Sequence, residues 1–199
     1  AGQEAWCVGG CVRDTLLGRT PEDWDVTTSA LPEEILTLFR DHAIPTGLRH
    51  GTVTVRSDHR NVEVTTYRLD GPYHDHRRPD SVVFTRSLQE DLARRDFTVN
   101  AMAMDLRGQV RDPFGGRADL ERKLLRCVGD PDRRFSEDAL RILRCLRFAA
   151  VLGCSIHPDT AAAVHRNRAL LAEIAQERIQ AELGKLLTGE RAAEVLRED

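Results

Sequence analysis

Short apolar runs separated by turns fill the first part of the chain. They are rich in β-branched residues, a pattern typical of strands that have one buried face. The predicted strands are Ala5–Val8, Trp24–Thr27, Thr52–Arg56, Asn61–Tyr67 and Val82–Phe84.

Helical spacing appears between some of these runs. Pro32–His42 is predicted as a helix because proline suits the first turn. A second helix is predicted over Phe97–Met104, and a short one from Val12 into Thr15–Gly18.

The last third of the chain shows helical periodicity and no strand pattern. We expect helices over Ser136–Leu152, Pro158–Leu171 and Ala175–Leu187, the first starting at the Ser136 to Asp138 cap signal and ending at Gly153. Strands followed by helices favour an α+β fold, with a domain at 1–130 joined to an all-α domain at 131–199.

Composition narrows the class of protein. The 199 residues carry a net charge of −3, which argues against gripping nucleic acid by bulk positive charge. No apolar run approaches the roughly 18 residues of a membrane span, so no membrane partner is expected. The five cysteines lack metal-ligand spacing and suit a reducing cytoplasm. The 29 basic residues include only two lysines, so arginine, with its bidentate fork, supplies nearly all positive charge.

Acidic residues on two predicted strands suggest a metal site. Asp23 and Asp25 would share one strand face, and two close carboxylates suit Mg²⁺. Glu63 would face away from its valine neighbours and could add a third carboxylate to a two-metal site. The alternative is that all three are solvated acids.

A glycine pair follows the first predicted strand. Gly9 and Gly10 could bring backbone N–H groups to a phosphate, with Arg13 adding a charged contact. A simple turn is the alternative, but Asp23 and Asp25 lie close by in sequence, and a phosphate cradle beside metal carboxylates describes triphosphate chemistry.

Two further segments combine charge with apolar anchors. In Arg94 to Asn100, either Asp96 caps a helix, or Arg95 and Asp96 reach the phosphate and ribose of a nucleotide. In the segment from Glu137 to Arg147, Asp138 and Arg141 would be i,i+3 neighbours on a helix. They would form either a structural ion pair or a pair that recognises a nucleotide base.

Recognition of a base by Asp138 and Arg141 would select particular bases. An Asp accepts from an exocyclic amine while an Arg donates to a ring nitrogen, which selects cytosine and adenine together. Arg144 and Arg147 continue the three-residue spacing but rotate around the helix, so they would serve phosphates, RNA or packing.

Taken together, these motifs resemble the class II tRNA nucleotidyltransferases (CCA-adding enzymes) and bacterial poly(A) polymerases. The resemblance rests on Val8–Gly18, Asp23–Thr28, Arg94–Ala103, Asp112–Gly116, Glu137–Ala149 and Glu177–Ile179.

The resemblance implies a mixed-sheet head domain, a helical neck, and transfer of CMP and/or AMP from CTP and ATP to a tRNA 3′ end. Asp23 and Asp25 would hold two Mg²⁺ ions, with Glu63 at the position of the third strand carboxylate. The implied nucleotide-binding residues are Gly9, Gly10, Arg13, Arg95, Asp96, Asn100, Asp138, Arg141, Arg144 and Arg147.

The resemblance also bears on the length of the chain and on which nucleotides it adds. The family continues into body and tail domains, so we expect this chain to be a fragment or a short version. The segment Gly71–Phe84 falls where the family has a flexible loop linked to the switch from C to A addition, which disfavours a CC-only enzyme. A poly(A) polymerase, a CC- or A-adding specialist and a non-catalytic nucleotide-binding fragment stay open as alternatives.

Overall fold

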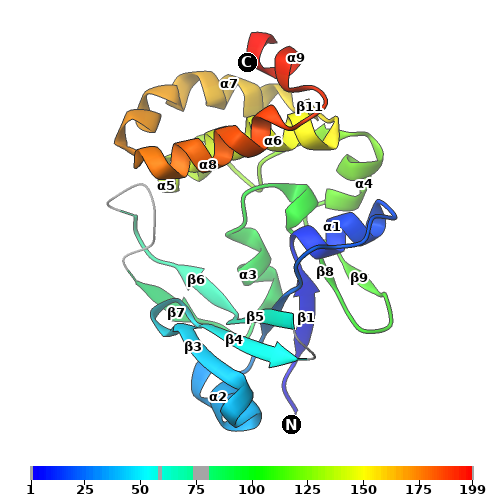
Figure 1. Cartoon of the computed structure of the whole chain (residues 1–199), viewed down its shortest axis with the longest axis vertical. Helices are drawn as coiled ribbons and strands as arrows, with labels where there is room; N and C mark the ends of the chain where they lie inside the picture. Colours follow the sequence, from blue (N-terminus) through cyan, green and yellow to red (C-terminus); the bar gives the residue numbers. More distant parts are fainter. Residues whose placement is uncertain (1, 58–59, 74–80, 199) are drawn as a thin grey trace. The chain divides into compact units, whose positions relative to one another are not determined.

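The computed structural model describes residues 2–57, 60–73 and 81–198, so residues 74–80 of the loop predicted over Gly71–Phe84 lie outside the described residues. The chain forms two compact units (Figure 1). The first contains residues 2–71, 81–95 and 100–116, and the second contains 72–73, 96–99 and 117–198. The second unit thus takes in residues 117–130 and 96–99, which the sequence pattern had assigned to the first domain.

A mixed sheet forms the centre of the first unit. Within the described residues, seven strands follow the order β3-β4-β5-β2-β1-β8-β9, with β2 parallel to β5 and the other neighbours antiparallel. A separate pair, β6 and β7, is antiparallel. The bounds are β1 (Ala5–Val8), β2 (Asp25–Thr28), β3 (Ala43–Gly47), β4 (Thr52–Ser57), β5 (Arg60–Thr66), β6 (Arg68–Asp70), β7 (Val82–Phe84), β8 (Ala103–Met104) and β9 (Val110–Arg111).

Alternation along β2 and β5 gives the sheet two different faces. Val62 and Val64 of β5 pack with Ile35 of helix α2 (Pro32–Phe39) in one apolar cluster. Glu63 points to the opposite face from Val62 and Val64, because successive side chains of a strand alternate between faces. The register of the two strands sets Asp25 of β2 beside it. Burial of the valines therefore fixes which way the carboxylates point.

Three short helices and one-turn segments complete the first unit. Helix α1 (Gly10–Leu16) follows β1 directly, and α3 (Leu88–Ala93) begins at Ser87, whose side chain accepts from the Glu90 N–H. On the polar side of the sheet, Val8, Leu92 and Ala103 form a second apolar cluster. The one-turn helices of this unit are η1 (Arg40–His42) and η2 (Leu48–His50), and η3 (Thr98–Asn100) spans the boundary between the units in the sequence.

The second unit is built mainly of helices. Leu140 and Leu143 of α6 pack with Ile174, Leu170 and Ile179, and α6 lies beside α8 (Figure 1). Two short parallel strands join its start to its middle. The elements are α4 (Gly116–Glu121), β10 (Leu124–Leu125), α5 (Pro131–Glu137), α6 (Leu140–Leu152), β11 (Ser155–Ile156), α7 (Pro158–Asn167), η4 (Arg168–Glu173), α8 (Gln176–Leu187) and α9 (Ala192–Glu198).

Two predicted helices are wrong. Instead of a helix over Phe97–Met104, the chain forms one turn and then β8, because this apolar segment is buried on every side rather than along one stripe. The helix predicted over Ser136–Leu152 is broken at Asp138, which is extended at φ −138° and ψ 102°. Asp138 Oδ1 accepts from the Leu140 N–H at 3.2 Å and starts α6.

The other predicted elements are present, with two differences in the part predicted to be all-α: β11 forms where no strand was predicted, and the helix predicted over Pro158–Leu171 ends at Asn167 and is followed by η4. The strand expected at Trp24–Thr27 is displaced by one residue, so Asp23 lies in a bend before β2. Gly153 ends α6 with φ 67° as expected. No helix in the described part of the chain has the length and apolar character needed to cross a membrane.

Candidate active site

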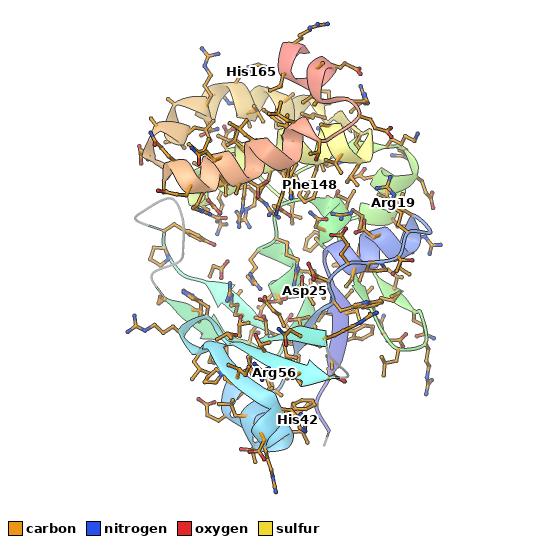
Figure 2. All side chains as sticks on the ribbon, in the orientation of Figure 1. Arg19, Asp25, His42, Arg56, Phe148 and His165 are labelled. Atoms are coloured by element: carbon orange, nitrogen blue, oxygen red, sulfur yellow. The ribbon has the colours of Figure 1, made fainter. Side chains whose placement is uncertain are left out.

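Three acidic residues, Asp23, Asp25 and Glu63, lie near the start of β2. The register of β2 and β5 sets Asp25, labelled in Figure 2, directly opposite Glu63. Asp23 is two residues earlier in the chain. The predicted alternation does not apply to Asp23, because it precedes the strand.

These carboxylates interact through their charge. Partial desolvation by neighbouring groups raises the pKa of Glu63, an exposed residue, and repulsion from Asp25 and Asp23 raises it further. Partial desolvation likewise raises the pKa of Asp25; the Arg95 guanidinium opposes this rise and Asp23 adds to it. The start of β2 is therefore a place where added positive charge is favourable.

The three carboxylates do not enclose a closed metal cage. Within residues 2–57, 60–73 and 81–198, no group of three or more His, Cys, Asp or Glu side chains converges closely enough to hold an ion without rearrangement. The carboxylate set is thus open and electrostatically coupled rather than closed.

The turn between β1 and α1 requires glycine at its first position. Gly9 has φ 77° and ψ −133°, and a Cβ there would lie 3.2 Å from Arg95 Nη1. A Cβ at Gly10 would lie 3.5 Å from Arg13 Nη2, which is an ordinary contact. The glycine turn and two arginines therefore approach each other closely.

Arg13 is held on both sides of its guanidinium. Nε and Nη2 each donate to the carboxylate of Asp14 at 2.9 Å, and Nη1 donates to Asn100 Oδ1 at 2.8 Å. The structure thus brings together two residues, Arg13 and Asn100, that are far apart in sequence and that sequence analysis had singled out independently.

Asp91 is a polar residue that sequence analysis missed. Its side chain has no exposed surface, and it accepts hydrogen bonds from Arg94 Nε at 3.0 Å and Nη2 at 2.9 Å, and from Arg95 Nη2 at 3.4 Å. Burial opposes its ionisation, but the charges of Arg94 and Arg95 lower the pKa of Asp91 below its ordinary value. Its position three and four residues before two adjacent arginines is the signal that could have found it.

In the second unit, Asp96 pairs with an arginine of α6. Arg144 donates to Asp96 Oδ2 from Nε at 2.9 Å and from Nη2 at 2.5 Å. Attraction to Asp96 raises the pKa of Arg144. Asp96 does not cap a helix; its Oδ1 accepts from the Phe97 N–H at 2.8 Å.

Asp138 and Arg141 each have other partners. Arg178 Nη2 lies 3.3 Å from Asp138 Oδ2, and Arg141 Nη1 donates to Glu137 Oε2 at 2.8 Å. Although burial lowers the pKa of Arg141, attraction to nearby acids, Asp96 first, raises it overall. The two side chains are therefore not i,i+3 neighbours on one helix, as predicted, but flank the start of α6.

Arg147 lies against an aromatic ring and an acid. Its guanidinium is 4.1 Å from the centre of the Phe148 ring, which Figure 2 labels, and its Nε is 3.0 Å from Glu182 Oε2. Helix packing, one of the roles considered for this residue, is thus what its contacts provide.

Comparison with known proteins gives consistent results along the chain. Residues 5–126 match the family described as "Poly A polymerase head domain", and residues 153–198 match "Probable RNA and SrmB- binding site of polymerase A". A CCA-adding enzyme of Geobacillus thermodenitrificans is 54% identical over 195 residues, covering 98% of this chain and 48% of the relative.

Solved structures agree with these sequence matches. The Bacillus stearothermophilus CCA-adding enzyme in complex with CTP superimposes with a TM-score of 0.89 and 48% identity, covering 98% of this chain and 47% of that one. A tRNA nucleotidyltransferase complexed with a primer tRNA and an incoming ATP analog gives 0.78 and 34%, covering 98% and 56%.

The chain spans about half the length of the curated relatives it matches. The match over residues 5–126 includes the β1–α1 turn, the β2 carboxylates and the Arg94–Arg95 pair, so it covers the sheet and the charged groups described above. By this match, the chain belongs to the family of the poly A polymerase head domain.

Proposed function

We propose that this chain is the catalytic part of an RNA nucleotidyltransferase that transfers CMP and AMP from CTP and ATP to the 3′ end of tRNA. The observation that carries the proposal is the open carboxylate set of Asp23, Asp25 and Glu63 next to a glycine turn and arginines. Its relatives' printed names, CCA-adding enzyme and a complex with CTP, support this substrate class.

The donor set fits Mg²⁺. Carboxylate oxygens are the ligands this hard cation takes, and the repulsion among Asp23, Asp25 and Glu63, which adds to desolvation in raising the pKa of Asp25 and Glu63, supports a cation there. When bound, the ions would lower the pKa of the RNA 3′ hydroxyl and neutralise the triphosphate. Asp23 and Asp25 would hold them, with Glu63 supporting from the neighbouring strand.

Groups around the first strand would hold the triphosphate. Gly9 and Gly10 allow close approach of the backbone, and Arg13, fixed by Asp14 and Asn100, offers positive charge beside them. Arg95 would add a phosphate contact near Gly9. The nucleotide would thereby be oriented for in-line attack with little movement of the protein.

Side chains of the second unit would select the base and sugar. Asp138 and Arg141 present an acceptor and a donor on either side of the α6 start, which suits the amine-beside-acceptor edge of cytosine and adenine. Asp96 would reach the ribose, and Arg144 and Arg147 would assist through Asp96 and the Phe148 ring.

Free thiols support a reducing cytoplasm as the place of action. All five cysteines are unbridged, and burial raises the pKa of Cys127 to about 12, which keeps that thiol inert.

The direct test offers labelled CTP, ATP, UTP or GTP with Mg²⁺ to tRNAs ending before, within and after the CCA terminus. Addition of C and A only to the incomplete ends is the expected result. Repeated addition of A alone would replace the proposal by poly(A) synthesis. A short RNA primer does not need a tRNA-binding surface, so it distinguishes weak tRNA binding from absent catalysis. If nucleotides are added to neither tRNA nor the primer, the proposed catalytic function is overturned.

A further inference from the structure

Asp91 stands out as a fully buried acid connected to several separate segments of the first unit. Besides Arg94 and Arg95, its carboxylate lies 3.1 Å from Thr27 Oγ1 and accepts from the Arg68 N–H at 3.3 Å. A buried carboxylate with this many donors is ionised and rigidly placed. Asp91 therefore fixes the end of α3 against β2 and β6.

One of these contacts leads to the carboxylate strand. Thr27 follows Asp25 by two residues on β2, so both side chains lie on the same sheet face. Thr27 is itself fully buried and lies within hydrogen-bond distance of the Thr65 carbonyl at 3.1 Å. Asp91 is thus anchored to β2, the strand that carries Asp25 and pairs with the strand of Glu63.

The other contact leads to the arginine beside the glycine turn. Arg95 is 19% exposed in its side chain, and its Nη2 lies 3.4 Å from Asp91 Oδ2, a looser contact than the 2.9 Å from Arg94 Nη2 to Oδ1. Its Nη1 lies against Gly9. Arg94 therefore makes the closer contact with Asp91, whereas Arg95 makes a longer one from a partly exposed guanidinium beside the glycine turn.

We propose that Asp91 is a positioning residue that holds Arg95 beside the glycine turn so that it can bind the β- and γ-phosphates of any incoming nucleotide. Asp91 touches neither nucleotide nor metal in this role; it acts through Arg95. The inference rests on the proposed function for its place in turnover, but the phosphate grip itself can be measured without turnover.

Inorganic pyrophosphate measures phosphate binding alone, because it has neither base nor ribose. Calorimetry with pyrophosphate and Mg²⁺ on Asp91→Asn is expected to show about 10-fold weaker binding than the unchanged protein. In steady state, the KM values for CTP and ATP should rise by the same factor of about 10 while kcat stays within about 3-fold, since a ground-state contact is lost.

A double-mutant cycle connects the effect to Arg95. Arg95→Met should weaken pyrophosphate binding by itself, and adding Asp91→Asn to it should produce little further loss, because both changes remove the same contact. Additive losses would overturn the proposal, since Asp91 would then act by another route.

The matched control is Asp119 of α4, which is also buried and also bound by a threonine and an arginine. Its carboxylate accepts from Thr98 Oγ1 at 2.8 Å and from Arg126 Nη2 at 2.7 Å. Asp119→Asn should lower stability but leave pyrophosphate affinity unchanged. A similar affinity loss in both variants would show a structural effect only and would overturn the positioning role.

If Asp91→Asn does not fold, Thr27→Val provides the second variant, since it removes a single anchor of Asp91 while keeping the side-chain shape. A two- to threefold loss of pyrophosphate affinity is expected, and no change would contradict the proposal. Asp91-dependent pyrophosphate binding without nucleotide transfer would overturn the proposed function alone; transfer with unchanged affinity and KM in Asp91→Asn would overturn this inference alone.

Discussion

Two groups of acidic side chains, one in each unit, have opposite surroundings. At the start of β2, Asp25 and Glu63 lie opposite each other with raised pKa values, so like charges are left facing like charges. In the second unit Asp96 pairs with Arg144, and Glu137 accepts from three arginines.

This difference separates two kinds of chemistry. Carboxylates that repel each other are stabilised by divalent cations, whereas carboxylates already paired with guanidinium groups have little affinity for a metal. Paired Asp and Arg side chains keep fixed orientations and can present hydrogen bonds to a neutral base edge. We infer that the first unit is suited to metal-assisted chemistry and the second to recognition.

Removing one of the repelling carboxylates is the strongest test of this comparison. Asp25→Asn should lower the rate of nucleotide transfer by about 10³-fold or more, because metal-assisted charge stabilisation provides several kcal/mol. The melting temperature should not fall, since the change relieves repulsion. Asp41→Asn, at an exposed acid of η1, is the control and should keep full activity. Turnover retained in Asp25→Asn would refute the metal assignment.

Reversing a hydrogen-bonding edge tests recognition in the second unit. Asp138→Arg should reduce the preference for CTP over UTP by roughly 10- to 100-fold, since one well-made pair discriminates by about 1–3 kcal/mol. The measurement is kcat/KM for both nucleotides. Asp132→Arg changes an acid that pairs with Arg166 at the exposed surface, and it should leave the preference intact. Unchanged selection in Asp138→Arg would remove the templating role.

Breaking the pair of Asp96 and Arg144 should lower the free energy of unfolding. Asp96→Asn leaves Arg144 without its charged partner, and we expect a loss of about 2 kcal/mol in the free energy of unfolding, measured in urea. Asp132→Asn breaks an exposed pair and should change it by less than about 0.5 kcal/mol. Equal stabilities of the two variants would show that the Asp96 pair contributes nothing beyond a surface contact.

The smallest expected effect concerns the glycine turn. Gly9→Ala and Gly108→Ala both place a side chain at positive φ, 77° and 80°, and each should lower stability by about 1 kcal/mol. A Cβ at Gly108 meets nothing within 4 Å, whereas one at Gly9 meets Arg95. Only Gly9→Ala should raise the nucleotide KM, by a few-fold. An equal KM in both variants would show that the Arg95 contact is unimportant.

Much of the sheet could be predicted because its pattern is local. Alternating valines fixed the faces of β5, and β1 and β7 have the expected bounds. Strand β3 escaped notice because Pro45 and Gly47 interrupt its pattern. The pattern around Phe97 predicts a helix wrongly, because a completely buried segment has no polar positions to show whether its side chains repeat with the period of a strand or of a helix.

The site was predictable only where its residues are close in sequence or share a strand pattern. The face of its strand on which Glu63 lies could be predicted from alternation, but the distant partners of Asp96 and Arg13 could not. Arg144 and Asn100 lie 48 and 87 residues away from them. Such contacts depend on how elements pack, and nothing in a short window of sequence encodes the distance between them.

The division of the chain into units also bears on how the protein can fold. Phe97 has no exposed surface, and it bridges Cys127 in the second unit although strands of the first unit lie on both sides of it in sequence. No single cut can therefore release the second unit intact. A fragment beginning at residue 117 would lack Phe97 and would expose the apolar surface that Phe97 covers. The second unit therefore needs residues 96–99 as well as the segment from residue 117 onward to complete its packing.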